Sequence, residues 1–274
     1  MTFVSRSRFR NGIVIFLGFW TSFLSLPGIG AATETVRLKP REGAAQNMVL
    51  LRPADVAIGA VVLYAGGSGS IGVKQDGKIK RTGNFLVRSR QLFAEAGFLV
   101  AVPDRPSDWA GSNKFDYRLT QSHALDALAI IDFLRSETKG PVWLVSTSRG
   151  SISAANNAAR LGAKGPDGIV LSASVTNPGN KIRPSVNDAA LERIEVPVLV
   201  LGHEDDDCYV TPWSEQRALV GRLIAAPSRA ALSVTGGKAG DMTQPCGPFS
   251  HHGFLGIERE TIRKITDWMK RHAK

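Results

Sequence analysis

The chain has 274 residues, of which 43% are hydrophobic and 21% are charged, values that are ordinary for a folded globular protein and exclude a largely disordered chain. Its formal net charge is +10, but the densest basic stretch, residues 74–81, has no aromatic side chain that could stack on bases. No nucleic-acid-binding motif surrounds that stretch. We therefore expect one large α/β domain and no nucleic-acid partner.

The first 32 residues have the pattern of a secretory signal peptide. Arg6, Arg8 and Arg10 precede the apolar run GIVIFLGFWTSFLSL, and the small residues GIGAA follow it. Cleavage near Ala32 would remove three arginines and no acid, which lowers the formal charge from +10 to +7. The alternative is an uncleaved anchor, although the run is shorter than the roughly 20 apolar residues that a membrane span needs. We expect a periplasmic or secreted protein with no membrane span after cleavage.

Short apolar or β-branched runs alternate with helical patterns after residue 45, which indicates βα units around a mostly parallel sheet with helices on both faces. Seven runs are expected to be strands: 48–52, 60–64, 97–102, 142–146, 168–174, 196–202 and 230–235. No repeat or linker divides the chain, so residues 33–274 are expected to form a single domain.

Two segments between and after these runs carry an apolar stripe at helical spacing. The stripes consist of Ala124, Leu128, Ile131 and Leu134 in the first segment, and of Ile262, Ile265 and Met269 in the last. A ligand site on such a sheet lies beyond the carboxyl ends of the strands. The loops 67–84 and 103–118 leave strands at that end, so both are candidate rims of a site.

The first of these loops begins GSGSIG, in which Gly67, Gly69 and Gly72 match the dinucleotide-binding pattern G-x-G-x-x-G. The polar, glycine-containing stretch that follows does not resemble the helix that this fingerprint requires, and no acidic residue ends a second strand about 20 residues later. Donation of backbone N–H groups to a developing oxyanion is a better use of these glycines.

The run VWLVSTSRGS, residues 142–151, leads from a strand into a helix rich in small residues. It differs by one residue from the G-x-S-x-G elbow that exposes a nucleophilic serine between a strand and a helix. Gly150 fills the second glycine position of that motif, and Ser146 replaces the first. Ser148 is therefore either a nucleophile or an ordinary helix N-cap.

Two later segments could complete a catalytic set. The strand VPVLVLG is followed by Asp205, Asp206 and Asp207, and the segment PFSHHGF places His251 and His252 just before the final helix. The chain order of serine, acid and histidine is that of an α/β-hydrolase.

With these segments, the chain resembles the α/β-hydrolase superfamily over roughly residues 46–272, and its dienelactone-hydrolase-like branch in particular. GNFLVRSRQLFAEAGFLVAVPDRPSDW, PVWLVSTSRGSISAA, DDDCYVTP and CGPFSHHGF look like a group of exported bacterial hydrolases with poorly defined substrates. Alignment with the family's LVLHGEDD ending places Asp206 in the acid position, with Asp205 as the alternative. The histidine of HGF, here His252, would be the base, with His251 as the alternative. True dienelactone hydrolases carry a cysteine where this chain has Ser148.

The resemblance implies the fold and the reaction type of a serine hydrolase, and we expect no cofactor. The sequence shows neither a separate propeller domain nor a long lid insertion, so we expect a small acyl substrate, namely a carboxylic ester. His252 would take the proton of Ser148, and Asp206 would orient the imidazole ring. The backbone N–H of Arg149, with that of Gly67 or Ser68, would bind the oxyanion. The side chains of Arg105 and Arg149 are candidates for recognising a carboxylate on the substrate.

The two cysteines of the chain, Cys208 and Cys246, form an even count in a compartment that would be oxidising, so we expect a disulfide between them. This bond would connect the loop that carries the acid to the loop that carries the base.

Three alternatives remain open at this point. The histidines, acids and cysteines of these two loops contain metal-ligand chemistry, although neither a C-x-x-C nor an H-E-x-x-H spacing is present, so we expect no metal. A pseudohydrolase would retain the fold for binding alone. A peptidase or amidase would use the same three residues on a different bond.

Overall fold

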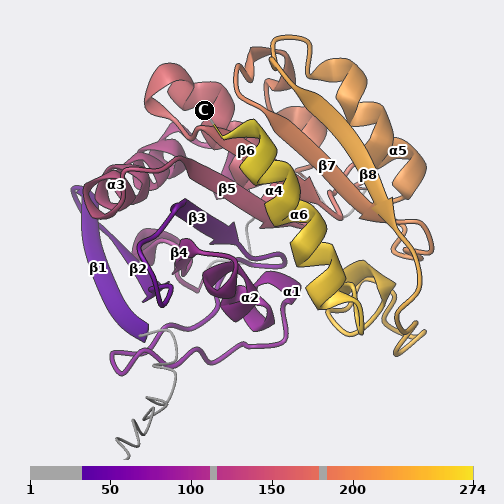
Figure 1. Ribbon diagram of the computed structural model, residues 1–274, viewed down its shortest axis with the longest axis horizontal. Helices are drawn as coiled ribbons and strands as arrows, with labels where there is room; N and C mark the ends of the chain where they lie inside the picture. Colours follow the sequence, from indigo (N-terminus) through magenta and orange to yellow (C-terminus); the bar gives the residue numbers. More distant parts are fainter. Residues whose placement is uncertain (1–32, 112–115, 179–183, 274) are drawn as a thin grey trace, which may run out of the picture.

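The computed structural model describes residues 33–111, 116–178 and 184–273. Within them, eight strands form one sheet in the order β1-β2-β4-β3-β5-β6-β7-β8. The pairs β1–β2 and β2–β4 are antiparallel and all other pairs are parallel, so the mostly parallel sheet is confirmed (Figure 1). The strands are β1 (Thr33–Arg41), β2 (Ala44–Leu51), β3 (Gly59–Tyr64), β4 (Phe98–Pro103), β5 (Val142–Thr147), β6 (Gly168–Ser172), β7 (Val198–His203) and β8 (Arg229–Val234).

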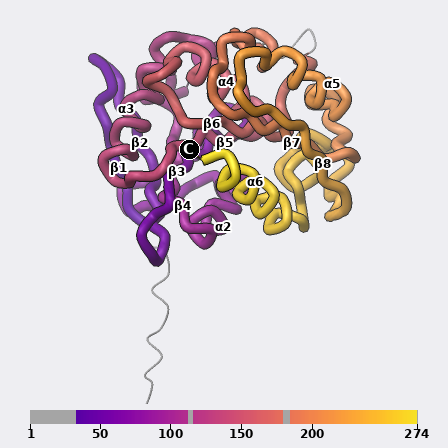
Figure 2. The backbone as a smooth tube through the Cα atoms, turned by 45° about the horizontal axis from the view of Figure 1, so that its top comes forward, coloured from indigo at the N-terminus to yellow at the C-terminus, as the bar shows by residue number. Residues whose placement is uncertain are grey.

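Helices cover both faces of this sheet, because successive side chains of its central strands point to opposite faces and are buried on both. Residues of α1, α2 and α6 pack on one face with Val61 and Leu63 of β3, and residues of α3 and α4 pack on the other with Ala60 and Val62. The tube view places α2 beside α6, far apart in sequence (Figure 2), and the ion pair Arg259–Glu95 joins them. The helices are α1 (Phe85–Arg88), α2 (Arg90–Glu95), α3 (Gln121–Glu137), α4 (Gly150–Leu161), α5 (Trp213–Ala218) and α6 (Glu258–His272).

All seven predicted strands are present with small shifts at their ends, whereas β1 was not predicted. β1 is an antiparallel edge strand whose residues are exposed or half-buried, so the apolar run that identifies the central strands is missing from it. Both predicted helical stripes are confirmed in α3 and α6, in which Ile131 and Ile265 are fully buried.

The predicted signal peptide, residues 1–32, lies outside the described residues, and its assignment stays a prediction. No helix in the part of the chain that the structure describes is long and apolar enough to cross a membrane.

One histidine of α3 is enclosed by aromatic rings in the core. His123 makes edge contacts with the rings of Tyr64 and Tyr117, and neither of its ring nitrogens has a hydrogen-bond partner within the described ranges. Burial, with smaller contributions from the positive charges of Arg118 and Arg41, lowers the pKa of His123 from 6.5 to about 3. The folded protein therefore holds this imidazole in its neutral form.

This burial is expected to make the protein sensitive to acid. Between pH 6.5 and about pH 3 the unfolded chain binds a proton on His123 that the folded chain does not, so the free energy of unfolding falls as the pH falls. The loss is on the order of 4 kcal/mol. Urea unfolding at pH 7 and pH 4 should show a smaller loss for His123→Phe than for the wild type. Equal losses would show that His123 is not the source.

Candidate active site

Ser148 occupies the sharp turn between β5 and α4. Its backbone φ is +54°, a left-handed conformation that strains a residue other than glycine, and its N–H donates to the carbonyl of Ser172 at 3.0 Å. The helix begins at Gly150 with Arg149 as its N-cap, so the interpretation of Ser148 as an ordinary N-cap is wrong. A strained, half-buried serine at the end of a central strand is the geometry that presents a nucleophile.

The residues on either side of Ser148 explain how the turn is accommodated. A Cβ atom at Gly150 would lie 2.2 Å from the carbonyl oxygen of Tyr64, so only glycine fits where α4 crosses β3. Ser146, which stands where the family motif has glycine, is buried and donates its hydroxyl to the carbonyl of Val170 at 2.7 Å. The serine is tolerated at this position because its hydroxyl bonds to the backbone of β6.

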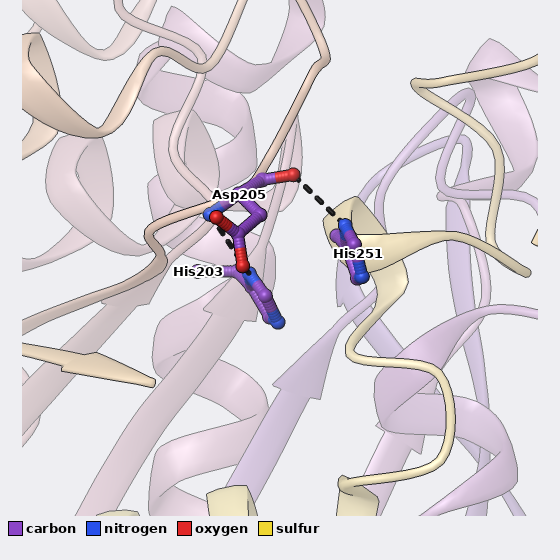
Figure 3. Close-up of side chains that lie close together, drawn as sticks. All are labelled: His203, Asp205 and His251. Carbon is purple, nitrogen blue, oxygen red and sulfur yellow. Dashed lines mark hydrogen bonds and ion pairs between the residues drawn. The ribbon is translucent and has the colours of Figure 1, made fainter. Parts of the chain in front are cut away.

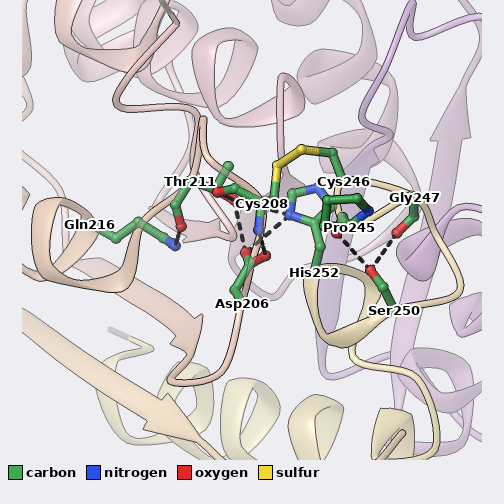
Figure 4. Close-up of a disulfide and its surroundings, with 9 residues drawn as sticks. All are labelled: Asp206, Cys208, Thr211, Gln216, Pro245, Cys246, Gly247, Ser250 and His252. Carbon is green, nitrogen blue, oxygen red and sulfur yellow. Dashed lines mark hydrogen bonds and ion pairs between the residues drawn. A yellow bond between two sulfur atoms is a disulfide. The ribbon is translucent and has the colours of Figure 1, made fainter. Parts of the chain in front are cut away.

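Asp206 and His252 form a buried hydrogen-bonded pair beyond the carboxyl end of β7 (Figure 4). The Asp206 carboxylate is fully buried and accepts from His252 Nδ1 at 3.1 Å and from the backbone N–H of Cys208 at 3.0 Å. Thr211 Oγ1 donates to Asp206 Oδ2 at 2.8 Å and lies 3.1 Å from His252 Nδ1. With its Nδ1 proton held by Asp206, the neutral imidazole has its lone pair on Nε2.

The alternative acid and base point elsewhere (Figure 3). His203 Nε2 lies 2.8 Å from the carbonyl of Gly236, to which it donates, and its Nδ1 accepts from the backbone N–H of Asp205 at 3.0 Å. His251 stacks on the His203 ring and donates from Nδ1 to the backbone carbonyl of Asp205. The side chain of Asp205 is 63% exposed. The structure therefore brings together Asp206 and His252, whereas Asp205 and His251 belong to a separate cluster.

Neither group of metal-ligating residues in these loops fits a metal ion as it stands. In the first, His203 and His251 stack with ring planes 14° apart, so their lone pairs lie in two nearly parallel planes, and His203 Nδ1 already accepts from the backbone N–H of Asp205. In the second, Cys208 lies beside Asp206 and His252, but its sulfur is in a disulfide and is not a thiolate ligand.

Two cavities meet at Ser148. The one we call the His252 cavity has a volume of about 310 Å³ and is lined by Ser148, His252, Gly67, Ser68, Ile71 and Phe85, among others. The Arg149 cavity, of about 430 Å³, is lined by Ser148, Arg149, Val175, Tyr209, Val210 and Gln244, among others. Ser148 and Gly67 line both, so a molecule that reacts with the serine can occupy both cavities at once.

The glycine loop after β3 packs directly against the serine. A Cβ atom at Gly66 would lie 2.9 Å from the Cβ of Ser148, which explains why this position has no side chain. Ser148 and His252 line the same cavity, although no hydrogen bond joins them in the described parts of the structure. Catalytic hydrogen bonds are often long in the absence of substrate.

Arg105 is not among the residues that line either cavity, and its role in substrate binding stays a prediction. It is buried, with its guanidinium over the ring of Tyr117 at 4.7 Å from the centroid. The loop 103–118 that carries it was a predicted rim, but its described part packs behind the glycine loop: the hydroxyl of Tyr117 donates to the carbonyl of Ser68 at 3.2 Å. Arg149, by contrast, lines the Arg149 cavity.

Cys208 and Cys246 form the expected disulfide between the acid loop and the base loop. Cys246 lines both cavities, and Cys208 donates its backbone N–H to Asp206. In the base loop, the Ser250 hydroxyl contacts the carbonyls of Pro245 and Gly247 (Figure 4). The disulfide therefore restrains the two loops whose relative position fixes the Asp206–His252 pair.

Removing this disulfide is expected to destabilise the protein by about 4 kcal/mol, because the bond closes a loop with a sequence separation of 38 residues. The variant Cys208→Ala/Cys246→Ala should therefore have a melting temperature lower by about 10 °C. Urea unfolding of the oxidised wild type and the double variant measures the difference. A stability equal to that of the wild type would show that the bond does not restrain the unfolded chain.

Comparison with known proteins supports the same fold. No protein-family model matches the sequence, and no curated protein is significantly similar to it. The chain is similar to a cold-adapted esterase from an Arctic intertidal metagenomic library, at 16% identity and a TM-score of 0.59 over 89% of this chain and 95% of that one. It is also similar to a dienelactone hydrolase from Anabaena variabilis, at 15% identity and a TM-score of 0.59 over 89% and 100%.

A third solved structure, the acylaminoacyl peptidase of Pyrococcus horikoshii, matches at 12% identity and a TM-score of 0.56 over 89% of this chain and 42% of that one. These likenesses, together with the sheet order and the turn at Ser148, show that the chain has the α/β-hydrolase fold.

Two features of the site were not predicted from the sequence. Thr211 contacts both Asp206 and His252, and the segment DDDCYVTP that contains it already stood out beside the acid. Arg118 lies buried behind the glycine loop. Its sequence neighbours gave no signal, because the contact joins residues about 50 positions apart.

Proposed function

We propose that the protein is an exported serine hydrolase that cleaves small carboxylic esters through Ser148, His252 and Asp206. The observation that carries the proposal is the strained, half-buried Ser148 at the end of β5, which lines one cavity together with the Asp206-bound His252. Esterases and a dienelactone hydrolase among the similar structures support the same reaction class.

In the proposed reaction, His252 Nε2 accepts the hydroxyl proton of Ser148 while the serine oxygen attacks the ester carbonyl. Asp206 holds the proton on Nδ1 and stabilises the imidazolium that forms. The backbone N–H groups of Arg149 and of Gly67 or Ser68 bind the oxyanion. The tetrahedral intermediate expels the alcohol, which takes the proton from His252. Water, deprotonated by the same imidazole, then releases the acid and restores the serine.

The two cavities suggest which part of the ester lies on each side. The departing alcohol must receive its proton from His252, and His252 lines only one of the two cavities. The alcohol therefore occupies the His252 cavity, whose walls include Ile71 and Phe85. The acyl group extends into the Arg149 cavity beside Tyr209. Cavities of this size accept a small ester rather than a folded polypeptide.

Export is part of the proposal. Residues 1–32 have a signal-peptide pattern, and the Cys208–Cys246 disulfide is typical of an oxidising compartment such as the periplasm or the cell exterior. In this interpretation the mature protein begins near residue 33, at the start of β1.

A panel of esters, matched amides and thioesters tests the function. We expect the mature protein to hydrolyse short acyl esters of phenols and small alcohols faster than the corresponding anilides. Preferential cleavage of the anilides would support an amidase with the same residues. No turnover of any acyl compound by the folded, disulfide-bonded protein would support a binding protein instead and would contradict the proposal.

A further inference from the structure

A fully buried arginine lies behind the loop that faces Ser148. Arg118 belongs to a short 3₁₀ helix, Asp116–Leu119, and its side chain is among the largest that are completely buried. Its Nη2 donates to the carbonyls of Ala65 at 3.1 Å and Gly67 at 3.3 Å. Its Nη1 donates to the hydroxyl of Ser153, on α4, at 2.6 Å. One guanidinium thus links the glycine loop to the helix that follows the candidate nucleophile.

Among the residues that the structure describes, no carboxylate forms an ion pair with Arg118. Its guanidinium lies over the ring of Tyr117 at 5.1 Å from the centroid, and the positive charge of Arg105 acts against it. Burial lowers the pKa of Arg118, because the charged form is poorly solvated there. A buried charge without a counter-ion lowers the free energy of unfolding, because the charge loses its hydration on folding. Such groups concentrate at functional sites.

The contacts of Arg118 fix the direction of a particular N–H group. In a trans peptide the C=O and N–H bonds point in opposite directions. The Gly67 carbonyl faces Arg118, so the N–H of Ser68 in the same peptide points away from it. Gly67 and Ser68 line the His252 cavity and Arg118 does not, so the loop lies between the guanidinium and the cavity. The Ser68 N–H is thereby directed to the cavity side.

The loop is also packed so that it cannot turn away from Arg118. A Cβ atom at Gly69 would lie 2.4 Å from the Tyr117 hydroxyl and 2.7 Å from Arg118 Nη2, so glycine is required there. The Tyr117 hydroxyl donates to the carbonyl of Ser68, and the N–H of Gly69 donates to the carbonyl of Gly66. Because a cation at the carbonyl end polarises a peptide, the N–H at its other end becomes a stronger donor.

We propose that Arg118 is the positioning residue of the oxyanion site: it holds the Gly67–Ser68 peptide so that the Ser68 N–H donates to the oxyanion, and its charge strengthens that donor. This inference rests on the proposed function and selects Ser68 over Gly67 as the loop's donor. Since an oxyanion exists only in the transition state and the intermediate, Arg118 affects kcat and leaves KM largely unchanged.

The test compares Arg118→Lys with the wild type on one phenyl ester. Lysine retains the charge but cannot span two carbonyls and a hydroxyl with a single ammonium. Losing a complete oxyanion donor lowers kcat by about 100-fold to 1000-fold, so partial misplacement should lower it by about 10-fold to 100-fold with KM changed by less than about threefold. The affinity for an arylboronic acid, which forms a tetrahedral adduct with the serine, should fall by the same factor as kcat/KM.

Arg135→Lys is the matched control. Arg135 also donates to two carbonyls, those of Lys164 and Gly165, but it lies near the amino end of β6, away from Ser148. We expect its kcat to equal that of the wild type. A wild-type kcat and boronate affinity in Arg118→Lys, even with a lowered melting temperature, would reduce Arg118 to a structural role and overturn the inference.

Ser153→Ala keeps the test informative if Arg118→Lys does not fold. This variant removes the hydroxyl that holds Nη1 of Arg118, so the guanidinium can shift away from the carbonyls of Ala65 and Gly67. A kcat lowered at least threefold with unchanged KM would support the inference, and an unchanged kcat would contradict it. Wild-type turnover that disappears in Ser148→Ala establishes the proposed function separately, so the two claims can fail independently.

Discussion

Ser148→Ala is expected to lower kcat/KM for esters by on the order of a million-fold, because the variant lacks the hydroxyl on which the acyl intermediate forms. The variant should fold as the wild type does, since alanine experiences the same strain at a φ of +54°. The rates, measured with a chromogenic ester after removal of contaminating hydrolases, test this directly.

Ser148→Gly separates chemistry from strain. Glycine adopts a positive φ without penalty, so this variant should be as inactive as Ser148→Ala but more stable than it by about 1 kcal/mol in urea unfolding. Hydrolysis by either variant within about tenfold of the wild type would exclude Ser148 as the nucleophile.

Asp206→Asn is expected to lower kcat by about 10,000-fold. An asparagine amide can donate to His252 Nδ1, which favours the tautomer with its proton on Nε2, and that nitrogen then cannot accept the proton of Ser148. The backbone N–H of Cys208 can still donate to the amide oxygen at the Oδ1 position, which should keep the acid loop folded in the variant.

Asp205→Asn is the matched control for this substitution. Its side chain is mostly exposed and lies 3.9 Å from His203, outside the contacts of His252. Its kcat should remain within about threefold of the wild type. The opposite ranking, with Asp205→Asn inactive and Asp206→Asn active, would show that Asp205 is the catalytic acid. It would contradict the proposed mechanism.

The sequence was most informative where an element is defined by local pattern. The central strands are buried on both faces, so they appear as continuous apolar runs, and the position of Ser148 between such a run and a small-residue helix follows from that. β1 escaped prediction because an edge strand with alternating charged residues has no such run. The choice between Asp205 and Asp206 came from family resemblance, since three adjacent acids are equivalent by composition.

The features that the sequence could not give depend on contacts between distant segments. Arg118 and Ala65 are 53 residues apart in the sequence, and Thr211 and His252 are 41 residues apart. No local sequence spacing therefore predicts either contact. Arg105, by contrast, received a predicted role from its place in the sequence alone. Its place in a loop at the carboxyl end of the sheet predicts substrate binding. The structure places its guanidinium over the ring of Tyr117, and the role in substrate binding stays a prediction.

Site mapping with a fluorophosphonate tests the central claim most directly. This reagent phosphonylates serines that are activated by a base and backed by an oxyanion site, so the mature, disulfide-bonded protein should be labelled rapidly, once, at Ser148. Mass spectrometry of the digested protein should show no label in Ser148→Ala and slow labelling in Asp206→Asn. A folded wild-type protein that remains unlabelled, or one labelled at another serine, would contradict the assignment of Ser148, Asp206 and His252 as a catalytic set.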